Sequence, residues 1–164
     1  MGIYRVRQMT PSSKRRFVNL STDPQFFAVL TGSYARLVGA PLVPPGKDPD
    51  WLYRYAPFAV VAHNTDPDPM FIYANKAAQT CFEYSWEELT SLPSRLSAEA
   101  PDRAERQSLL DAVALKGFLL GYRGVRVAKS GRRFIISGSV VWELVDADGV
   151  RHGQAATFRS WRDI

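Results

Sequence analysis

Residues 133–158, with the sequence RFIISGSVVWELVDADGVRHGQAATF, contain the clearest strand pattern of this chain. Residues 133–145 predict one long β-strand, because apolar side chains recur there with the period of two that a strand requires. The apolar positions expected on one face are Phe134, Ile136, Val140, Trp142 and Leu144. A turn with the sequence DADG at 146–149 leads into a final strand over 152–159. This part of the chain is therefore predicted to be antiparallel sheet.

Three shorter strands are predicted upstream of this stretch. Residues 59–63 and 70–73 flank the turn DPDP at 66–69, and together they predict a hairpin. Residues 122–128 precede the turn KSGR at 129–132, which connects them to the long strand. The sequence thus predicts a sheet of five antiparallel strands.

A helix is predicted on the N-terminal side of the sheet, over 23–38. Asp23 is its expected N-cap, and Pro24 fits the first helical position. Its apolar stripe consists of Phe26, Leu30, Tyr34 and Leu37. This stripe is expected to pack on the sheet or on a partner, because its side chains are too apolar to stay in water. Residues 40–50 contain four prolines and one glycine and predict a linker.

Short helices are predicted between the hairpin and the last three strands. Asn75 is the expected N-cap of the first one, and Ser85 with Glu88 predicts a capping box at the start of the second. Asp102 is the expected cap of a longer helix over 103–116. A hairpin, several helices and then three long strands is the order of an α+β fold.

The composition is that of a soluble globular domain. Of the 164 residues, 46% are hydrophobic and 23% are charged. The net charge of +5 comes mainly from residues 1–50, which hold seven basic and three acidic side chains. Residues 1–22 are predicted to be a basic, flexible tail. Neither a membrane-spanning run nor a secretory signal is predicted, so a cytoplasmic protein without membrane partners is expected. Nucleic acid is not an expected partner, because no basic face interleaved with aromatic residues follows the tail.

Few residues are available for metal or disulfide chemistry. The single cysteine, Cys81, excludes an internal disulfide framework. The only histidines are His63 and His152, whereas zinc sites usually need three or four protein ligands. Neither a metal-binding residue nor a catalytic residue is predicted.

Several short segments resemble one known family. FIYANKAA (71–78) and FEYSWEEL (82–89) resemble the part of a PAS domain where the second strand gives way to short helices, and KSGRRF (129–134) resembles a later hairpin of that family. The closer resemblance is to the MEKHLA domain, a PAS-like family of bacterial stand-alone proteins that also ends some plant homeodomain–leucine-zipper regulators. It covers about residues 23–161 and is carried in order by APF (56–58), YAN (73–75), LPSR (92–95), GVR (124–126), GRRF (131–134) and HGQAATF (152–158).

The resemblance implies a PAS-like, five-stranded antiparallel sheet, with short helices over one face, an N-terminal helix and an enclosed cavity. The PAS-like domain would span residues 51–164, after the helix and linker of 23–50. The implied function is a non-catalytic sensory or ligand-binding module that signals through association, as a homodimer or with another protein. The alternative is an interaction module that dimerises through its N-terminal helix and sheet. A third hypothesis, a small isomerase or dehydratase, requires a pocket with paired acid and base residues.

No cofactor is predicted. Flavin-binding PAS domains resemble one another through an Asn-Cys-Arg run later in the helical region, whereas Cys81 lies in the first short helix and is interpreted as a buried structural thiol. Haem-binding PAS domains use a histidine on the long helix, and residues 102–117 contain none.

Two arginines suggest the charge of a ligand. A planar guanidinium is the natural partner of a carboxylate or phosphate, so Arg95 or Arg126 pointing into the cavity predicts a small anionic ligand. The alternatives are that Arg126 faces solvent, and that Arg95 pairs with Glu99 or Asp102.

Four further residues complete the predicted site. Gln154 and Thr157 lie beside small residues of the last strand, which leave space, and both can orient a ligand. Trp142 and Tyr122 would wall the same space, although Trp142 could equally fill an apolar core. The predicted ligand site therefore consists of Arg95, Tyr122, Arg126, Trp142, Gln154 and Thr157.

Overall fold

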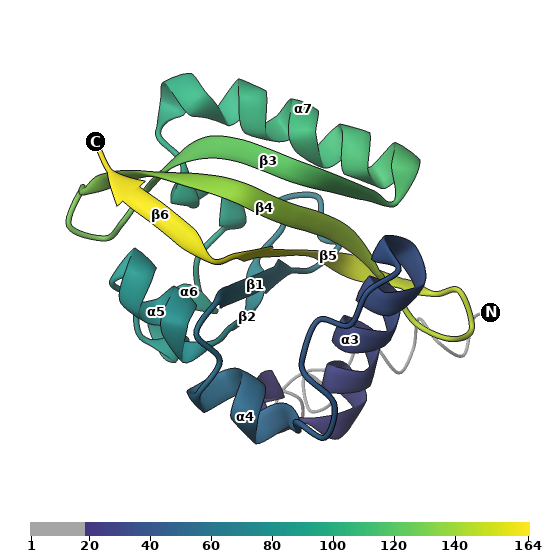
Figure 1. Ribbon diagram of the computed structural model, residues 1–164. Helices are drawn as coiled ribbons and strands as arrows, with labels where there is room; N and C mark the ends of the chain where they lie inside the picture. Colours follow the sequence, from purple (N-terminus) through teal and green to yellow (C-terminus); the bar gives the residue numbers. More distant parts are fainter. Residues whose placement is uncertain (1–18) are drawn as a thin grey trace.

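The computed structural model describes residues 19–164, apart from the side chains of residues 100 and 101. Its centre is a six-stranded antiparallel sheet with the order β2-β1-β5-β4-β3, in which β6 also pairs with β4 (Figure 1). The strands are β1 (Ala59–His63), β2 (Phe71–Ala74), β3 (Phe118–Val127), β4 (Arg133–Val145), β5 (Arg151–Phe158) and β6 (Ser160–Asp163). The five predicted strands and the α+β class are confirmed. The sequence analysis missed β6, which continues β5 past Arg159 and pairs with residues 134–137.

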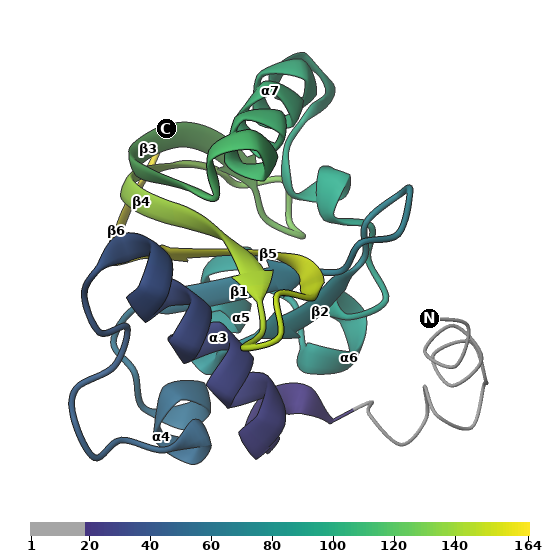
Figure 2. The same ribbon diagram turned by 90° about the vertical axis from the view of Figure 1, so that its right-hand side faces the viewer.

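Helices cover both faces of the sheet, as Figure 2 shows for α7 above it and α3 below it. The helices are α3 (Pro24–Val38), α4 (Pro49–Arg54), α5 (Lys76–Phe82), α6 (Trp86–Leu89) and α7 (Ala100–Lys116), with the 3-10 turns η1 (Leu20–Thr22) and η2 (Ser94–Ser97). One apolar core contains side chains of α5 and α7, and a second contains side chains of α3 and α4. The predicted linker therefore ends in a helix, α4, which contributes to the second core.

Local capping signals explain most helix starts. The Asp23 side chain accepts a hydrogen bond from the Phe26 backbone N–H at 3.0 Å, as its N-cap position predicts. Asn75 caps α5, and Ser85 with Glu88 forms the predicted capping box of α6. The expected cap of the long helix is wrong: α7 begins at Ala100, so Asp102 lies within its first turn.

The N-terminal helix packs on the sheet, as its apolar stripe predicts. Leu30 is fully buried in the second core, beside Trp142 of β4. The indole N–H of Trp142 donates to the Ser33 hydroxyl at 3.1 Å, and the Tyr34 ring meets the Trp142 ring edge-on with centroids 4.9 Å apart. These contacts fix α3 against β4 through both shape and a buried hydrogen bond.

One prediction about β4 is wrong, because its apolar positions do not share one face. Phe134 and Ile136 lie in the core beneath α5 and α7, whereas Trp142 and Leu144 lie in the core beneath α3 and α4. The register shifts near Gly138, which has a φ of 62°. A bulge with its glycine in the left-handed region adds one residue to a strand, and the following side chains therefore change faces.

The predicted basic tail falls largely on residues 1–18, which lie outside the described residues. Over residues 19–164, no helix combines the length and the apolar character needed to cross a membrane.

Candidate functional site

A cavity of about 50 Å³ lies between the sheet and α7. Its apolar walls come from the core beneath α5 and α7, and small side chains of β5, Ala155 and Ala156, leave part of the space open. The polar side chains that line it are His63, Ser97, Arg106, Tyr122, Arg126, Ser139 and Gln154. A cavity needs about 10–15 Å³ to hold one water, so this one is large enough for a water or a very small ligand.

Two arginines dominate the charge of the cavity. Arg106 of α7 is 7% exposed and Arg126 of β3 is 6% exposed. Arg126 donates to the backbone oxygen of Val125 at 2.7 Å and to the Tyr122 hydroxyl at 3.1 Å. Among residues 19–164, neither arginine forms an ion pair with a carboxylate, and Arg106 donates no hydrogen bond. The cavity is therefore cationic and lacks a counter-ion from the described chain.

Burial sets the protonation of Arg106. Burial, and to a smaller extent the nearby charge of Arg126, lower the pKa of Arg106 to about 10. The guanidinium still carries its charge at neutral pH, because this pKa lies well above 7. The cavity thus keeps the positive charge of Arg106 at a considerable desolvation cost.

Tyr122 connects the cavity to the surface of α7. Its hydroxyl donates to the Glu105 carboxylate at 3.0 Å and accepts from Arg126 at 3.1 Å. The phenol folds back along β3 over Gly124, where a Cβ atom would overlap the ring and hydroxyl. Glycine at this position therefore allows Tyr122 to reach Arg126. This contact explains why a glycine stands at position 124, the first residue of the GVR segment.

His63 and Gln154 form a cross-strand pair at the cavity, between β1 and β5. The His63 ring Nδ1 lies 3.0 Å from the backbone oxygen of Asn64, and the Gln154 amide donates to the backbone oxygen of Leu110 at 3.0 Å. Burial lowers the pKa of His63 to about 4, and the charges of Arg106 and Arg151 act in the same direction. The imidazole is consequently neutral at pH 7.

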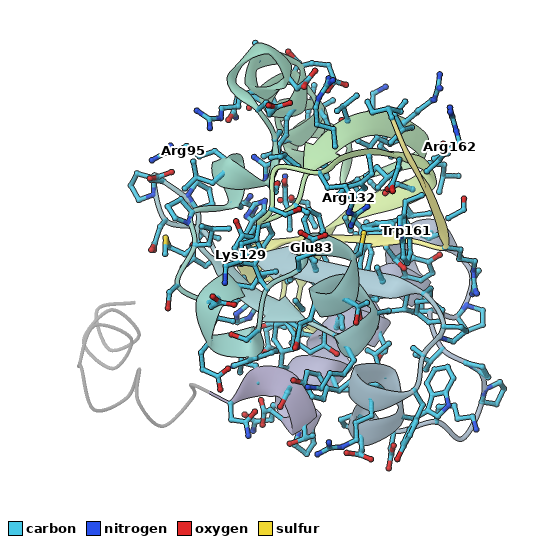
Figure 3. The ribbon with its side chains drawn as sticks, turned by 90° about the vertical axis from the view of Figure 1, so that its left-hand side faces the viewer. Glu83, Arg95, Lys129, Arg132, Trp161 and Arg162 are labelled. Carbon is cyan, nitrogen blue, oxygen red and sulfur yellow. The ribbon has the colours of Figure 1, made fainter. Side chains whose placement is uncertain are left out.

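The expectation that Arg95 points into the cavity is wrong. Arg95 lies on η2 at the outer rim of the protein, with its side chain 49% exposed (Figure 3). Its Nε donates to the Asp68 carboxylate at 3.2 Å, because the bridge between Met70 and Pro93 brings the 66–69 turn beside η2. The expected partner Glu99 pairs with Arg133 instead.

Two other predicted residues also lie outside the cavity. Trp142 faces α3, because the bulge at Gly138 turns it to the other side of the sheet. Thr157 donates its hydroxyl to the backbone oxygen of Ala59 at 2.9 Å and does not line the cavity. Tyr122, Arg126 and Gln154 do line it, so the structure brings together three of the six predicted residues.

Two residues of the cavity, Arg106 and His63, were not among the predicted ligand-site residues. A signal for Arg106 existed: it stands three and seven residues before Leu109 and Val113, so it shares the buried stripe of α7. A charged residue on the apolar face of a helix, such as Arg106, therefore indicates a buried site better than Arg95, which only follows the Pro93-Ser94 helix break.

Cys81 is part of the core, as predicted. The residue is 2% exposed, and burial raises the pKa of its thiol to about 12. Its backbone oxygen accepts from Arg132, which lies beside Glu83 (Figure 3). The described part of the chain, residues 19–164, holds no group of three His, Cys, Asp or Glu residues placed to bind a metal ion.

Known structures share this fold at low sequence identity. A PAS domain from Colwellia psychrerythraea is 21% identical, with 68% of this chain and 90% of that chain covered and a TM-score of 0.56. A fungal LOV domain photoreceptor is 17% identical, with 82% and 91% covered and a TM-score of 0.54. An RNA-binding light-oxygen-voltage receptor is 20% identical, with 76% and 35% covered and a TM-score of 0.58. These likenesses show the fold.

The protein family of this chain is shown by a sequence match over most of its length. No curated protein matches the chain. The sequence model of the MEKHLA domain matches residues 24–163, from the start of α3 to the end of β6, and so includes the N-terminal helix. The matched segment contains the cavity, both buried arginines and the strands that enclose them. The chain therefore belongs to the MEKHLA domain family and has the fold of a PAS domain.

Proposed function

We propose that this MEKHLA domain is a non-catalytic sensory module that binds a small anion in the cavity between its sheet and α7. The observation that carries this proposal is the pair of buried arginines, Arg106 and Arg126, which have no carboxylate partner among residues 19–164. The PAS and LOV domains that share its fold support a sensory role.

An anion would offset the cost of the buried charges. Taking a guanidinium out of water costs several kcal/mol unless an opposite charge or hydrogen-bond acceptors replace the lost hydration. Arg106 offers its unpaired N–H groups, and Arg126 is already oriented by Val125 and Tyr122. A carboxylate, phosphate or sulfate of few atoms satisfies both the charge and the volume of about 50 Å³.

Ligand binding would be transmitted through α7. Arg106 belongs to α7 and Arg126 to β3, so an anion held by both ties the helix to the sheet. Leu115 and Leu120, on either side of the Gly117 turn between these elements, are 86% and 56% exposed. We expect this apolar surface to contact a partner protein or a second copy of the chain, with the contact changed by ligand binding.

Titration calorimetry at low ionic strength tests this proposal with acetate, phosphate and sulfate as probes. We expect at least one of them to bind wild-type protein with one site per chain, and Arg106→Met to weaken that binding at least about tenfold. Arg95→Met is the matched control and should leave binding unchanged, because Arg95 lies on the surface. Absence of binding to the wild type, or equal binding by Arg106→Met, would contradict the proposal.

The same two leucines favour a second candidate function, that of an interaction module without a ligand. In that case Leu115→Ser or Leu120→Ser changes the oligomeric state measured by analytical ultracentrifugation, and no anion affects it. An anion-dependent change would support the sensory module instead.

A further inference from the structure

Two hydrogen-bond acceptors face the cavity without a donor. The His63 Nε2 atom and the Gln154 Oε1 atom are fully buried, and neither forms a hydrogen bond of good geometry among the described residues, although the Gln154 side chain lies close enough to the His63 ring to raise its pKa slightly. His63 is 7% exposed and Gln154 is 2% exposed. A buried acceptor left without a donor costs about 1–3 kcal/mol, so both atoms need an explanation.

Backbone contacts fix the orientation of both groups. The Asn64 oxygen next to His63 Nδ1 requires the proton on that nitrogen, which leaves Nε2 with a free lone pair. The Leu110 oxygen requires the amide nitrogen of Gln154, because a flipped amide would set two oxygens against each other. The two residues lie opposite each other in the β1–β5 pair and their side chains interact, so both acceptors face the same part of the cavity.

The donor that fits this place is neutral. Arg106 and Arg126 line the same cavity, and the charge of Arg106 already acts on the His63 ring. An ammonium group would add a third positive charge to a site without a carboxylate from the protein, whereas a hydroxyl supplies one proton without charge, which the two neighbouring acceptors can share.

We propose that the ligand is a small hydroxycarboxylate, whose carboxylate binds Arg106 and Arg126 and whose hydroxyl donates to His63 Nε2 or Gln154 Oε1. This inference rests on the proposed anion-binding function and adds a second requirement to it. The cavity of about 50 Å³ is small and therefore favours glycolate, which is among the smallest hydroxycarboxylates.

Glycolate and acetate test this inference, because they differ only by the hydroxyl group. We expect wild-type protein to bind glycolate at least about tenfold more tightly than acetate in titration calorimetry, since a site built to hydrogen-bond a hydroxyl discriminates against a ligand that lacks it. Gln154→Met keeps the side-chain length and removes one acceptor. His63→Asn keeps a donor for the Asn64 oxygen and removes the other. Both variants together should bring the two affinities within about twofold of each other, whereas Gln107→Met, on the exposed face of α7, should not change their ratio.

The outcomes separate the inference from the proposed function. If glycolate and acetate bind wild-type protein equally and both depend on Arg106, a buried water satisfies the two acceptors, and the hydroxycarboxylate inference is overturned while anion binding stands. If neither glycolate nor acetate nor any inorganic anion binds, the proposed function fails, and this inference fails with it. A preference for glycolate that is lost in the double variant supports both.

Discussion

Replacing Arg106 by methionine should make the ligand-free protein more stable. Arg106 is buried on the apolar face of α7 and donates no hydrogen bond among the described residues. Methionine keeps a side chain of similar length in the core and removes the charge. The change therefore removes a desolvation penalty without breaking a hydrogen bond or ion pair among residues 19–164.

The size of this effect follows from the pKa of Arg106. Burial lowers that pKa from its ordinary value to about 10. At about 1.36 kcal/mol for each pH unit, this lowering corresponds to about 3 kcal/mol of unfavourable free energy in the folded state. The penalty is fully present at neutral pH, because the guanidinium is charged everywhere below its folded pKa. We expect Arg106→Met to raise the free energy of unfolding by about 1–3 kcal/mol.

Equilibrium unfolding in urea, followed by tryptophan fluorescence, measures this change in a buffer free of small carboxylates, phosphate and sulfate. Arg95→Met is the control and should stay within about 0.5 kcal/mol of wild type, because exposed ion pairs contribute little. A loss of more than about 1 kcal/mol in Arg106→Met would instead show that the guanidinium has a stabilising partner.

Three further predictions concern His63, Gly153 and Leu30. As the pH falls from 6.5 to 4, the free energy of unfolding of the wild type should decrease by up to about 3 kcal/mol more than that of His63→Asn, as measured by urea unfolding. The reason is that the His63 ring takes up a proton in the unfolded state, whereas the buried ring, with a pKa of about 4, stays neutral in the folded state. Gly153→Ala should lower the free energy of unfolding by about 1–3 kcal/mol or more, because its Cβ would overlap the His63 backbone oxygen. Gly131→Ala should lower it less, because no atom lies near the position of that Cβ, and equal losses of stability in the two variants would contradict this prediction. Leu30→Ala should cost about 2–5 kcal/mol in thermal or urea unfolding, and a loss below 1 kcal/mol would show that α3 does not pack as described.

Features set by nearby residues could be predicted from the sequence. Asp23, Asn75 and Ser85 cap helices through hydrogen bonds to residues three positions later, so the pattern alone places them. The faces of β4 could not be predicted in the same way. One glycine at 138 reverses the alternation, and nothing in the local pattern separates a bulge from an ordinary strand glycine.

The candidate site was only half predictable for a related reason. Tyr122, Arg126 and Gln154 lie on strands that the family resemblance orders correctly, so they reach the cavity. Arg95 depends on a contact between η2 and the 66–69 turn, 27 residues earlier in the chain, which supplies Asp68 as its partner. Arg106 was predictable from the apolar stripe of α7, and its charge was the informative departure from that stripe.

The most direct test of the account is a crystal structure of the protein soaked in bromide, with anomalous scattering used to locate the ion. Bromide reports a cationic, desolvated site whether or not the natural ligand carries a hydroxyl. We expect an anomalous peak inside the cavity, in contact with Arg106 and Arg126, that disappears in crystals of Arg106→Met. Peaks confined to surface residues such as Arg95, with none in the cavity, would contradict the claim that this MEKHLA domain contains an anion site.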